Sequence, residues 1–324
     1  MNIRALPFAG SLVVAFAFFP LFIWGAQSNT RAIIHIPTKS LTSMPLFFGK
    51  DKGFFAREGV DADLVLMSPP TAIAALVAGE LDFSTTVGAG ISATMRGLPI
   101  KRILYIQQYV TFSLMALPEI KSIRDLIGKS VGTVALTDAT AIAAREILKG
   151  NSIDPSAVTF FYTQSTESSR VALTTKKLSA AMLPPPFAEE AQARGFSRLA
   201  EARDYAPLSG IGLLASADSL NRNPTKGPSV IRAVLRTMAY MRDPKNHGEL
   251  IEYILKMHKL DSTVAAEALA TVMAVYSKDG TKPHEAVQNE IDIYREVLKI
   301  TKPFTPEDLE DMSYLKRALE YLNR

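Results

Sequence analysis

The sequence predicts an α/β fold of two lobes, each built on a mostly parallel sheet flanked by helices, followed by a helical C-terminal region. Hydrophobic residues make up 48% of the chain and charged residues 21%, which is typical of a globular protein. The 324 residues exceed what one small core usually organises. Short apolar runs that suit buried strands alternate with helix-like segments up to about residue 216, and only helix-like segments follow.

The first series of elements extends from about residue 32 to residue 106. Strands are predicted at residues 32–36, 61–67, 81–85 and 100–106. Ser43 and Ser68 occupy expected helix N-caps, with a proline soon after each, and Gly79 marks a helix end. A third, short helix is predicted over residues 91–96. This βαβ order predicts a parallel sheet that binds ligands beyond the carboxyl ends of its strands, in loops 37–44, 85–90 and 107–111.

A second, similar series begins near residue 113. Strands are predicted at residues 113–117, 130–135, 158–163, 179–183 and 211–216, with helices over 137–150, 166–177 and from the prolines at 184–186 to Gly195. Helices follow over 229–242, 249–260, 264–276 and 285–300, and Thr305 is the predicted N-cap of the final helix. We expect residues 29–108 and 213–324 to form lobe I and residues 109–212 to form lobe II, joined by two crossing strands.

The N-terminus has the pattern of an export signal. Arg4 precedes an apolar, uncharged run from Leu6 to Trp24, and the small residues Ala26 and Ser28 follow. We therefore predict that residues 1–28 are a signal peptide cleaved after Ser28, which places the protein in the periplasm. The alternative is an uncleaved anchor, because the run approaches the length that spans a membrane.

Composition excludes several classes of site. The chain has no cysteine, which excludes disulfides, thiolate metal ligands and a cysteine nucleophile. The net charge of +4 comes from scattered Lys and Arg rather than from a basic stripe, so we do not expect nucleic acid as a partner. The four histidines lie far apart in the sequence, and we expect neither a metal site nor a cofactor.

Three ordered motifs carry a family resemblance. They are MPLFFGKDKGFFAREGV at residues 44–60, ALVAGELDF at 75–83 and IRDLIGK at 123–129. Together they resemble the signatures of nitrate/sulfonate/taurine-type and thiamine-precursor-type (NMT1/THI5-like) binding proteins. The chain departs from that pattern in the second lobe, where Lys177 and Ser179 replace a common Gly-x-Asp.

The resemblance implies a two-lobed periplasmic-binding-protein fold of type II that closes on its ligand by hinge motion. It implies a monomeric solute-binding protein that hands a sulfonate, taurine, nitrate, carboxylate or pyrimidine-like solute to an ABC permease and its ATPase. It implies no catalytic residues. Two alternatives remain open: a periplasmic sensor that presents its ligand to a receptor, and a fold-related enzyme of thiamine-pyrimidine or menaquinone biosynthesis.

The candidate ligand contacts are polar residues in the loops after the predicted strands. Hydroxyl groups, an amide and a helix N-terminus offer hydrogen-bond donors to an anion, although the same residues also serve as ordinary helix caps. The absence of Arg from these loops argues against a tightly clamped dianion. Tyr109, Phe112 and Tyr162 are candidates for stacking on a ring. The predicted contacts are Ser40, Thr42, Ser43, Thr85, Thr86, Gln107, Thr137, Asp138 and Thr140.

Overall fold

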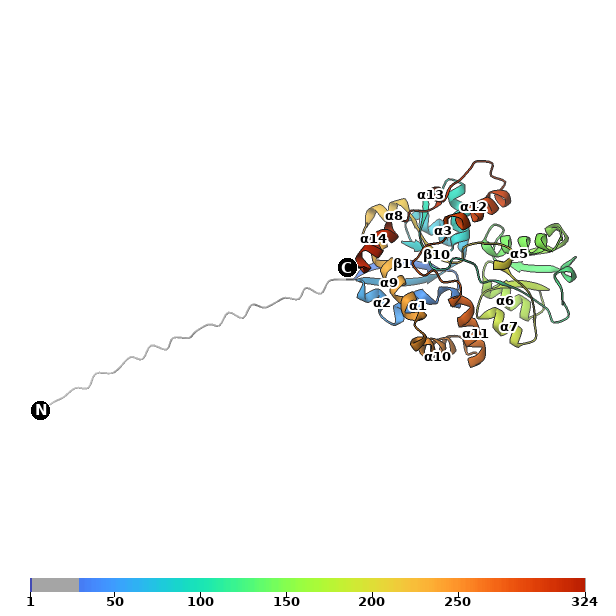
Figure 1. The fold of residues 1–324 in the computed structure, drawn as a ribbon, viewed down its shortest axis with the longest axis horizontal. Helices are drawn as coiled ribbons and strands as arrows, with labels where there is room; N and C mark the ends of the chain where they lie inside the picture. The colour runs from blue at the N-terminus through green and yellow to red at the C-terminus, as the bar shows by residue number, and fades with distance from the viewer. Residues whose placement is uncertain (2–28, 324) are drawn as a thin grey trace.

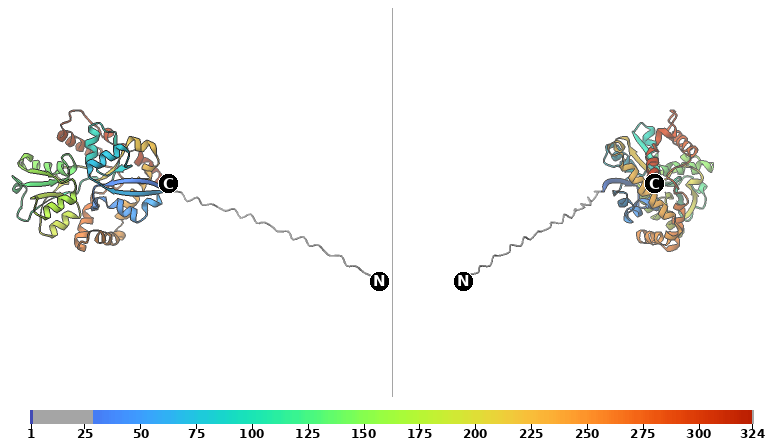
Figure 2. Two further views of the ribbon diagram at one scale, coloured as in Figure 1. Left: turned by 180° about the vertical axis from the view of Figure 1, so that it is seen from behind. Right: turned by 60° about the vertical axis from the view of Figure 1, so that its left-hand side comes forward.

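A computed structural model describes Met1 and residues 29–323. The predicted signal peptide, apart from its first residue, lies outside the described residues. Both ends of the described body, at Thr30 and at the last helix, lie at the same edge of the molecule (Figures 1 and 2).

Two five-stranded sheets form the framework (Figure 1). In spatial order the first sheet contains β2 (Val60–Leu66), β1 (Thr30–Ile36), β3 (Phe83–Ser84), β10 (Gly212–Ser216) and β4 (Ile100–Tyr105). The second contains β7 (Thr159–Tyr162), β6 (Ser130–Thr133), β8 (Ala180–Leu183), β5 (Ser113–Ala116) and β9 (Ser197–Glu201). In each sheet one strand, the fourth in spatial order (β10 or β5), runs in the direction opposite to the other four. The prediction of mostly parallel sheets is confirmed.

Helices cover both sheets and make up the C-terminal region. Those of the strand-containing part are α1 (Met44–Asp51), α2 (Phe54–Arg57), α3 (Pro69–Ala78), α4 (Val87–Met95), α5 (Ala139–Gly150), α6 (Thr166–Thr174) and α7 (Phe187–Ala193). The C-terminal ones are α8 (Ala217–Arg222), α9 (Lys226–Arg242), α10 (His247–His258), α11 (Ser262–Met273), α12 (His284–Leu298), α13 (Pro306–Leu309) and α14 (Ser313–Leu322). Short 3₁₀ helices lie at Leu41–Ser43, Ile123–Leu126, Pro155–Ala157, Ala202–Asp204 and Pro244–Asn246.

Four sequence predictions need correction. Strand β9 was not predicted, because its half-buried sequence SRLAE lacks an alternating apolar pattern. Helix α8 was also not predicted. Helix α4 begins at Val87 rather than at residue 91. Thr305 forms a capping box with Asp308, but it caps only the four-residue α13, and the final helix starts at Ser313.

The glycines at the start of α4 explain why its length was underestimated. Two glycines in one turn lower helix propensity. In the structure they make room for neighbours: a Cβ on Gly88 would meet Tyr294 Oη, and one on Gly90 would meet a methyl group of Leu214. Tertiary packing therefore favours glycine in this helix.

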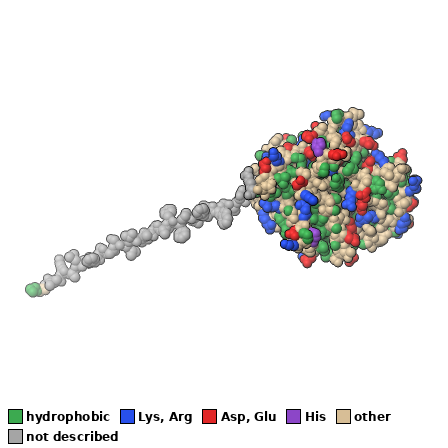
Figure 3. Space-filling view, in the orientation of Figure 1, with side chains coloured by type: hydrophobic (Ala, Val, Ile, Leu, Met, Phe, Trp, Pro, Cys, Tyr) green, Lys and Arg blue, Asp and Glu red, His purple; other side chains and the backbone are tan. Residues whose placement is uncertain are grey.

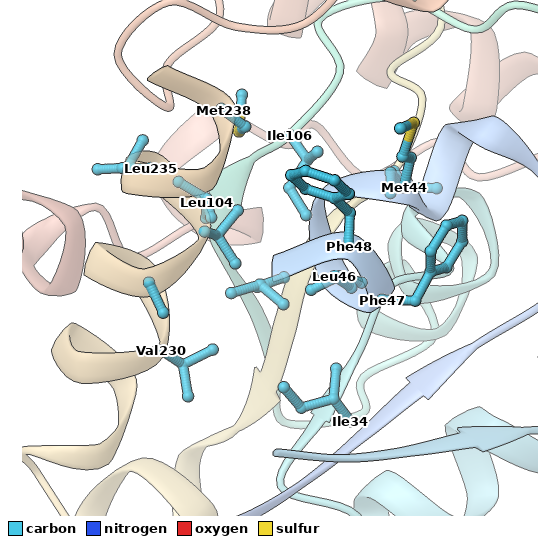
Figure 4. Close-up of a cluster of buried hydrophobic side chains, with 14 of the residues drawn as sticks. Ile34, Met44, Leu46, Phe47, Phe48, Leu104, Ile106, Val230, Leu235 and Met238 are labelled. Carbon is cyan, nitrogen blue, oxygen red and sulfur yellow. The ribbon is translucent and has the colours of Figure 1, made fainter. Parts of the chain in front are cut away.

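The largest hydrophobic cluster lies where α1 and α9 cover the first sheet (Figure 4). Leu46 and Phe48 of α1 face Leu235 and Met238 of α9 above Ile34 of β1. Burial of each such side chain contributes about 1.5–3 kcal/mol to folding. The apolar helix in the first family-like motif is thus part of the core.

A second hydrophobic cluster crosses between the two halves of the molecule. It joins Ile91 of α4 and Ile291 of α12, which flank the first sheet, to Ile142 of α5, which flanks the second. The two sheets are therefore packed against each other through their helices as well as linked by the chain.

The surface in Figure 3 mixes Lys and Arg with Asp and Glu, without a field of one sign on the face shown. Among the described residues, no helix combines the length and hydropathy needed to span a bilayer. Within the same residues, no group of three or more His, Asp or Glu side chains is arranged to hold a metal ion.

Candidate functional site

A pocket with about 680 Å³ of empty space lies between the two sheets. Its walls come from the segments that follow β1, β2, β3, β4, β6, β7 and β8 and from the segment that leads into β10. This is the position that the topology predicts for a ligand, beyond the carboxyl ends of parallel strands. The pocket is lined by Pro37, Thr38, Ser40, Thr42, Pro69, Thr85, Thr86, Val87, Gly88, Ala89, Gln107, Val110, Thr111, Phe112, Val134, Asp138, Ala139, Thr140, Ser165, Thr166, Pro184, Ser209, Gly210 and Ile211.

Seven of the nine predicted contacts line this pocket: Ser40, Thr42, Thr85, Thr86, Gln107, Asp138 and Thr140. The other two do not. Ser43 is the N-cap residue of α1, but its buried hydroxyl makes no capping hydrogen bond. Thr137 lies just outside the pocket, where its carbonyl oxygen accepts a hydrogen bond from Ser92 Oγ at 3.0 Å. A role of the seven in ligand binding stays a prediction.

Four residues that line the pocket carry a buried hydrogen-bonding atom without a partner. Thr85 Oγ1, Gln107 Nε2, Thr111 Oγ1 and Thr166 Oγ1 are buried and have no hydrogen-bond partner among the described residues. Their side chains are 0%, 1%, 3% and 8% exposed. A buried polar group without a partner costs about 1–3 kcal/mol, so natural proteins rarely keep several together. A bound solute would satisfy them.

Two of these four residues were missed by sequence reasoning. Thr111 ends the loop 107–111, which was predicted to lie at the site, but Gln107 was the one residue of that loop chosen as a contact. Thr166 opens α6, which the sequence analysis treated only as a helix. The rule that placed the ligand at strand ends applies equally to the loop after β7, and it would have identified Thr166.

The first turn of α4 supplies further donors. Thr86 is its N-cap residue but makes no side-chain capping bond, and Val87, Gly88 and Ala89 of the first turn all line the pocket. The early N–H groups of a helix have no partner within the helix, and the helix dipole makes this end positive. Val87 N–H already donates to Thr85 O at 3.0 Å, so the first-turn donors left without a partner among the described residues are the N–H groups of Gly88 and Ala89.

The first turn of α5 is different because Asp138 caps it. Asp138 Oδ1 accepts hydrogen bonds from the backbone N–H groups of Ala141 (3.2 Å) and Ala135 (3.3 Å) and from Thr140 Oγ1 (2.8 Å). Burial raises the pKa of Asp138, although the Thr140 hydroxyl and the backbone N–H groups oppose this by stabilising the carboxylate. The predicted anion site at residues 137–140 is therefore already occupied by the protein's own carboxylate.

Asp138 is the single ionisable side chain that lines the pocket within the described part of the chain. The rest of the wall is hydroxyl, amide and apolar. Phe112 is the one of the three predicted stacking residues that reaches it. Tyr109 instead lies against Lys282 Nζ, and Tyr162 is exposed beside Arg145.

A buried charge cluster lies directly behind the wall at Ser209. Glu290 accepts hydrogen bonds from Ser209 N (2.7 Å) and Ser209 Oγ (2.5 Å), and it pairs with Lys282 and Arg102, each at 3.4 Å. Burial alone would raise the pKa of Glu290, but these two cations hold it below its ordinary value. The cluster positions one wall of the pocket without exposing a charge in it.

Hydrogen bonds join the two halves of the molecule around the pocket. Leu41 N–H donates to Pro185 O at 3.0 Å on one side, and Ser92 Oγ donates to Thr137 O on the other. Helix α11 also contacts α7, where Thr271 Oγ1 donates to Glu189 Oε1 at 3.3 Å. The two halves therefore contact each other at several places around the pocket.

Comparison with known proteins identifies similar chains. The family model described as NMT1/THI5 like matches residues 41–247, which is more than half of the chain. A search of curated proteins found no match.

Among solved structures, the ligand-binding component of an ABC-type import system from Staphylococcus aureus, with zinc bound, is 16% identical, with a TM-score of 0.73 over 90% of this chain and 99% of that chain. The alkanesulfonate-binding protein SsuA from Xanthomonas axonopodis pv. citri, bound to MOPS, is 14% identical, with a TM-score of 0.70 over 90% and 97%. The nitrate-binding protein NrtA from Synechocystis PCC 6803 is 11% identical, with a TM-score of 0.72 over 91% and 89%. The shared architecture is the periplasmic-binding-protein fold. These three neighbours are binding proteins rather than enzymes.

Proposed function

The chain belongs to the NMT1/THI5-like family, and on that premise we propose that it is the extracytoplasmic solute-binding protein of an ABC importer. The observation that carries this proposal is the pocket between the two sheets, whose lining includes four residues with a buried, unpartnered polar atom. Its position between two similar sheets supports a cycle in which the halves open, capture a solute and close on it. The import system named for the Staphylococcus aureus neighbour supports the same reading.

We propose that residues 29–108 and 213–324 form lobe I and that residues 109–212 form lobe II. The division of strands between the sheets supports this boundary, since β1 to β4 and β10 lie in one sheet and β5 to β9 in the other. The hinge segments would be the two connections at residues 106–112 and 202–211. They also contribute Gln107, Thr111 and Ser209 to the pocket, so a ligand that binds these residues would couple directly to hinge motion.

Export to the periplasm and an ABC permease with its ATPase as partners belong to this proposal. The apolar N-terminal run supports export. The solute is small and organic or anionic, because the donors at the pocket wall suit acceptor atoms. Alkanesulfonate and nitrate, which the names of two neighbours give as their ligands, set the first compounds to test.

The pocket favours binding over catalysis. Asp138 is the single titratable side chain at its wall among the described residues, and it is engaged as a helix cap. Within the described residues, no second titratable side chain lines the pocket to serve as the acid–base partner of Asp138 or to activate a nucleophile. A sensor function would use the same pocket, and it is distinguished by whether solute uptake depends on the protein.

The test has two arms. The purified protein is screened by thermal shift against alkylsulfonates, amino sulfonates, nitrate, carboxylates and pyrimidines, since a ligand of the native state raises the melting temperature. Uptake of the compound that binds is then measured in cells with and without the gene. Binding together with lost uptake supports the importer function. Binding with unchanged uptake would favour a sensor, and silence of a folded protein toward every class would contradict solute capture.

A further inference from the structure

We infer that the pocket selects solutes that carry an amino group as well as hydrogen-bond acceptors, neutral or zwitterionic overall, and that Asp138 receives the amino group. This inference rests on the proposed function and deepens it by naming the class of solute. It separates this chain from binding proteins of simple anions such as nitrate.

The charge of the pocket is the first argument. Across the described residues at its wall, the one ionisable group is a carboxylate, and neither Lys, Arg nor His accompanies it. A simple anion that entered this pocket would place a second negative charge near Asp138 without a counter-ion at the wall. Burying an unpaired charge is unfavourable, and a nearby like charge makes it more so.

The nearest cations do not relieve this imbalance. Arg102 and Lys282 lie behind Ser209, and both pair with Glu290, while Arg102 also lies 3.5 Å from Glu310. Two cations and two carboxylates balance each other within the cluster. The Ser209 hydroxyl, which lines the pocket, donates to Glu290 and is not free for a ligand.

Asp138 retains capacity to accept one further hydrogen bond. Three donor groups reach the carboxylate: the N–H groups of Ala135 and Ala141 bond to Oδ1, and the single hydroxyl proton of Thr140 is shared between Oδ1 at 2.8 Å and Oδ2 at 3.0 Å. An ionised carboxylate offers about four acceptor positions on its two oxygens. An amino group of a solute would use the remaining position and would supply the missing positive or donor character.

The rest of the wall requires hydrogen-bond acceptors on the solute, whereas Asp138 requires a donor. Gln107 Nε2 is a pure donor, and the hydroxyls of Thr85, Thr111 and Thr166 have no partner. The uncapped start of α4 adds backbone N–H donors. These groups suit a sulfonate, carboxylate or ring nitrogen at the other end of the same solute, while Phe112 and its apolar neighbours cover the part between.

Matched pairs of probes test this inference by calorimetry. Each pair differs by an amino group replaced with hydroxyl or hydrogen: 2-aminoethanesulfonate with 2-hydroxyethanesulfonate, 3-aminopropionate with 3-hydroxypropionate, and 4-aminopyrimidine with pyrimidine. We expect the amino member of at least one pair to bind about tenfold tighter or more, a factor worth about 1.4 kcal/mol. We expect Asp138→Asn to reduce that ratio to about one-third of its value or less, and Thr137→Ala, just outside the pocket, to leave it unchanged.

Asn is a good N-cap residue, so Asp138→Asn should preserve α5. Should this variant fail to fold, the affinity ratios of the probe pairs measured on wild type still test the inference. Equal or tighter binding of the member without the amino group overturns the inference, as does binding of nitrate or simple alkylsulfonates while every amino compound is silent. In both of those cases the proposed function of solute capture is not contradicted. Silence of all probes with folded protein overturns the inference and the proposed function together.

Discussion

The Glu290 carboxylate accepts both the backbone N–H and the hydroxyl of Ser209, at 2.7 and 2.5 Å. This pair fixes the segment before β10 to α12, and Lys282 and Arg102 complete the cluster at 3.4 Å. All of these side chains are buried. One wall of the pocket therefore depends on a charge network that is not itself part of the wall.

Replacing Glu290 with Gln should destabilise the protein by about 3–5 kcal/mol, because it leaves Arg102 and Lys282 buried without their shared carboxylate. The measurement is denaturant unfolding monitored by circular dichroism. Glu320→Gln, at an exposed position of α14, is the matched control and should change stability by no more than about 0.5 kcal/mol. Equal stability of the two variants would mean that the cluster does not hold the fold.

Burial of His35 should make stability fall in mild acid. His35 is 0% exposed, bonds to Ser84 Oγ and Met67 O, and burial lowers its pKa from 6.5 to about 4. Between pH 6.5 and 4 the unfolded chain binds a proton that the folded chain does not, so stability present above pH 6.5 is lost as the pH falls. The shift corresponds to about 3 kcal/mol.

The unfolding free energy of wild type minus that of His35→Gln should therefore fall by up to about 3 kcal/mol between pH 7 and 4, whatever the difference at pH 7. His258, whose pKa burial also lowers to about 4, titrates in both proteins and cancels in the comparison. Parallel pH profiles for the two proteins would show that His35 does not contribute this linkage.

The unpartnered hydroxyl of Thr85 should matter for ligand binding and not for folding. Thr85→Val keeps the shape and removes a buried group without a partner, so the melting temperature of the free protein should stay or rise. Affinity for the solute found in the screen should fall by about 1–3 kcal/mol if the hydroxyl binds it. Thr133→Val is the matched control, since Thr133 Oγ1 is also buried and unpartnered but lies outside the pocket lining. Equal affinities of both variants would remove Thr85 from the site.

Gly88 should be required for the approach of α4 to α5. A Cβ at this position would meet Tyr294 Oη and would lie 3.0 Å from Ala139 N. Gly88→Ala should therefore cost about 1–3 kcal/mol through overpacking. Gly248→Ala in α10, where a Cβ would meet nothing within 4 Å, should be neutral or stabilising. Thermal unfolding of the two variants gives the comparison, and a neutral Gly88→Ala would show that the two helices separate easily.

The fold was predictable because its strands are apolar and its helices begin and end at recognisable caps. Gly79 ends α3 in the left-handed conformation where the sequence placed it, and Thr305 is an N-cap as predicted, although it caps α13 rather than the final helix. Strand β9 was missed because its neighbours, rather than its own pattern, make it a strand: it pairs only with β5, at the sheet edge. Helix α4 was shortened in the prediction because contacts with distant residues favour its glycines.

The location of the pocket followed from topology, whereas the orientation of individual side chains did not. Thr137 and Thr140 are three residues apart at one helix start, yet only Thr140 reaches the pocket. The roles of the two helix N-termini were also not separable from sequence. Asp138 neutralises the start of α5, and the start of α4 stays uncapped, which becomes visible only once both helices face the same space.

Calorimetric titration of wild type and Gln107→Leu with the solute found in the screen tests whether that solute binds between the two sheets. Gln107 Nε2 is a buried donor without a partner at the hinge side of the pocket. We expect wild type to bind one solute per chain and Gln107→Leu to bind it at least about tenfold more weakly. The variant should still unfold cooperatively, as wild type does. Unchanged affinity and stoichiometry in a folded Gln107→Leu would contradict capture of the solute between the two sheets.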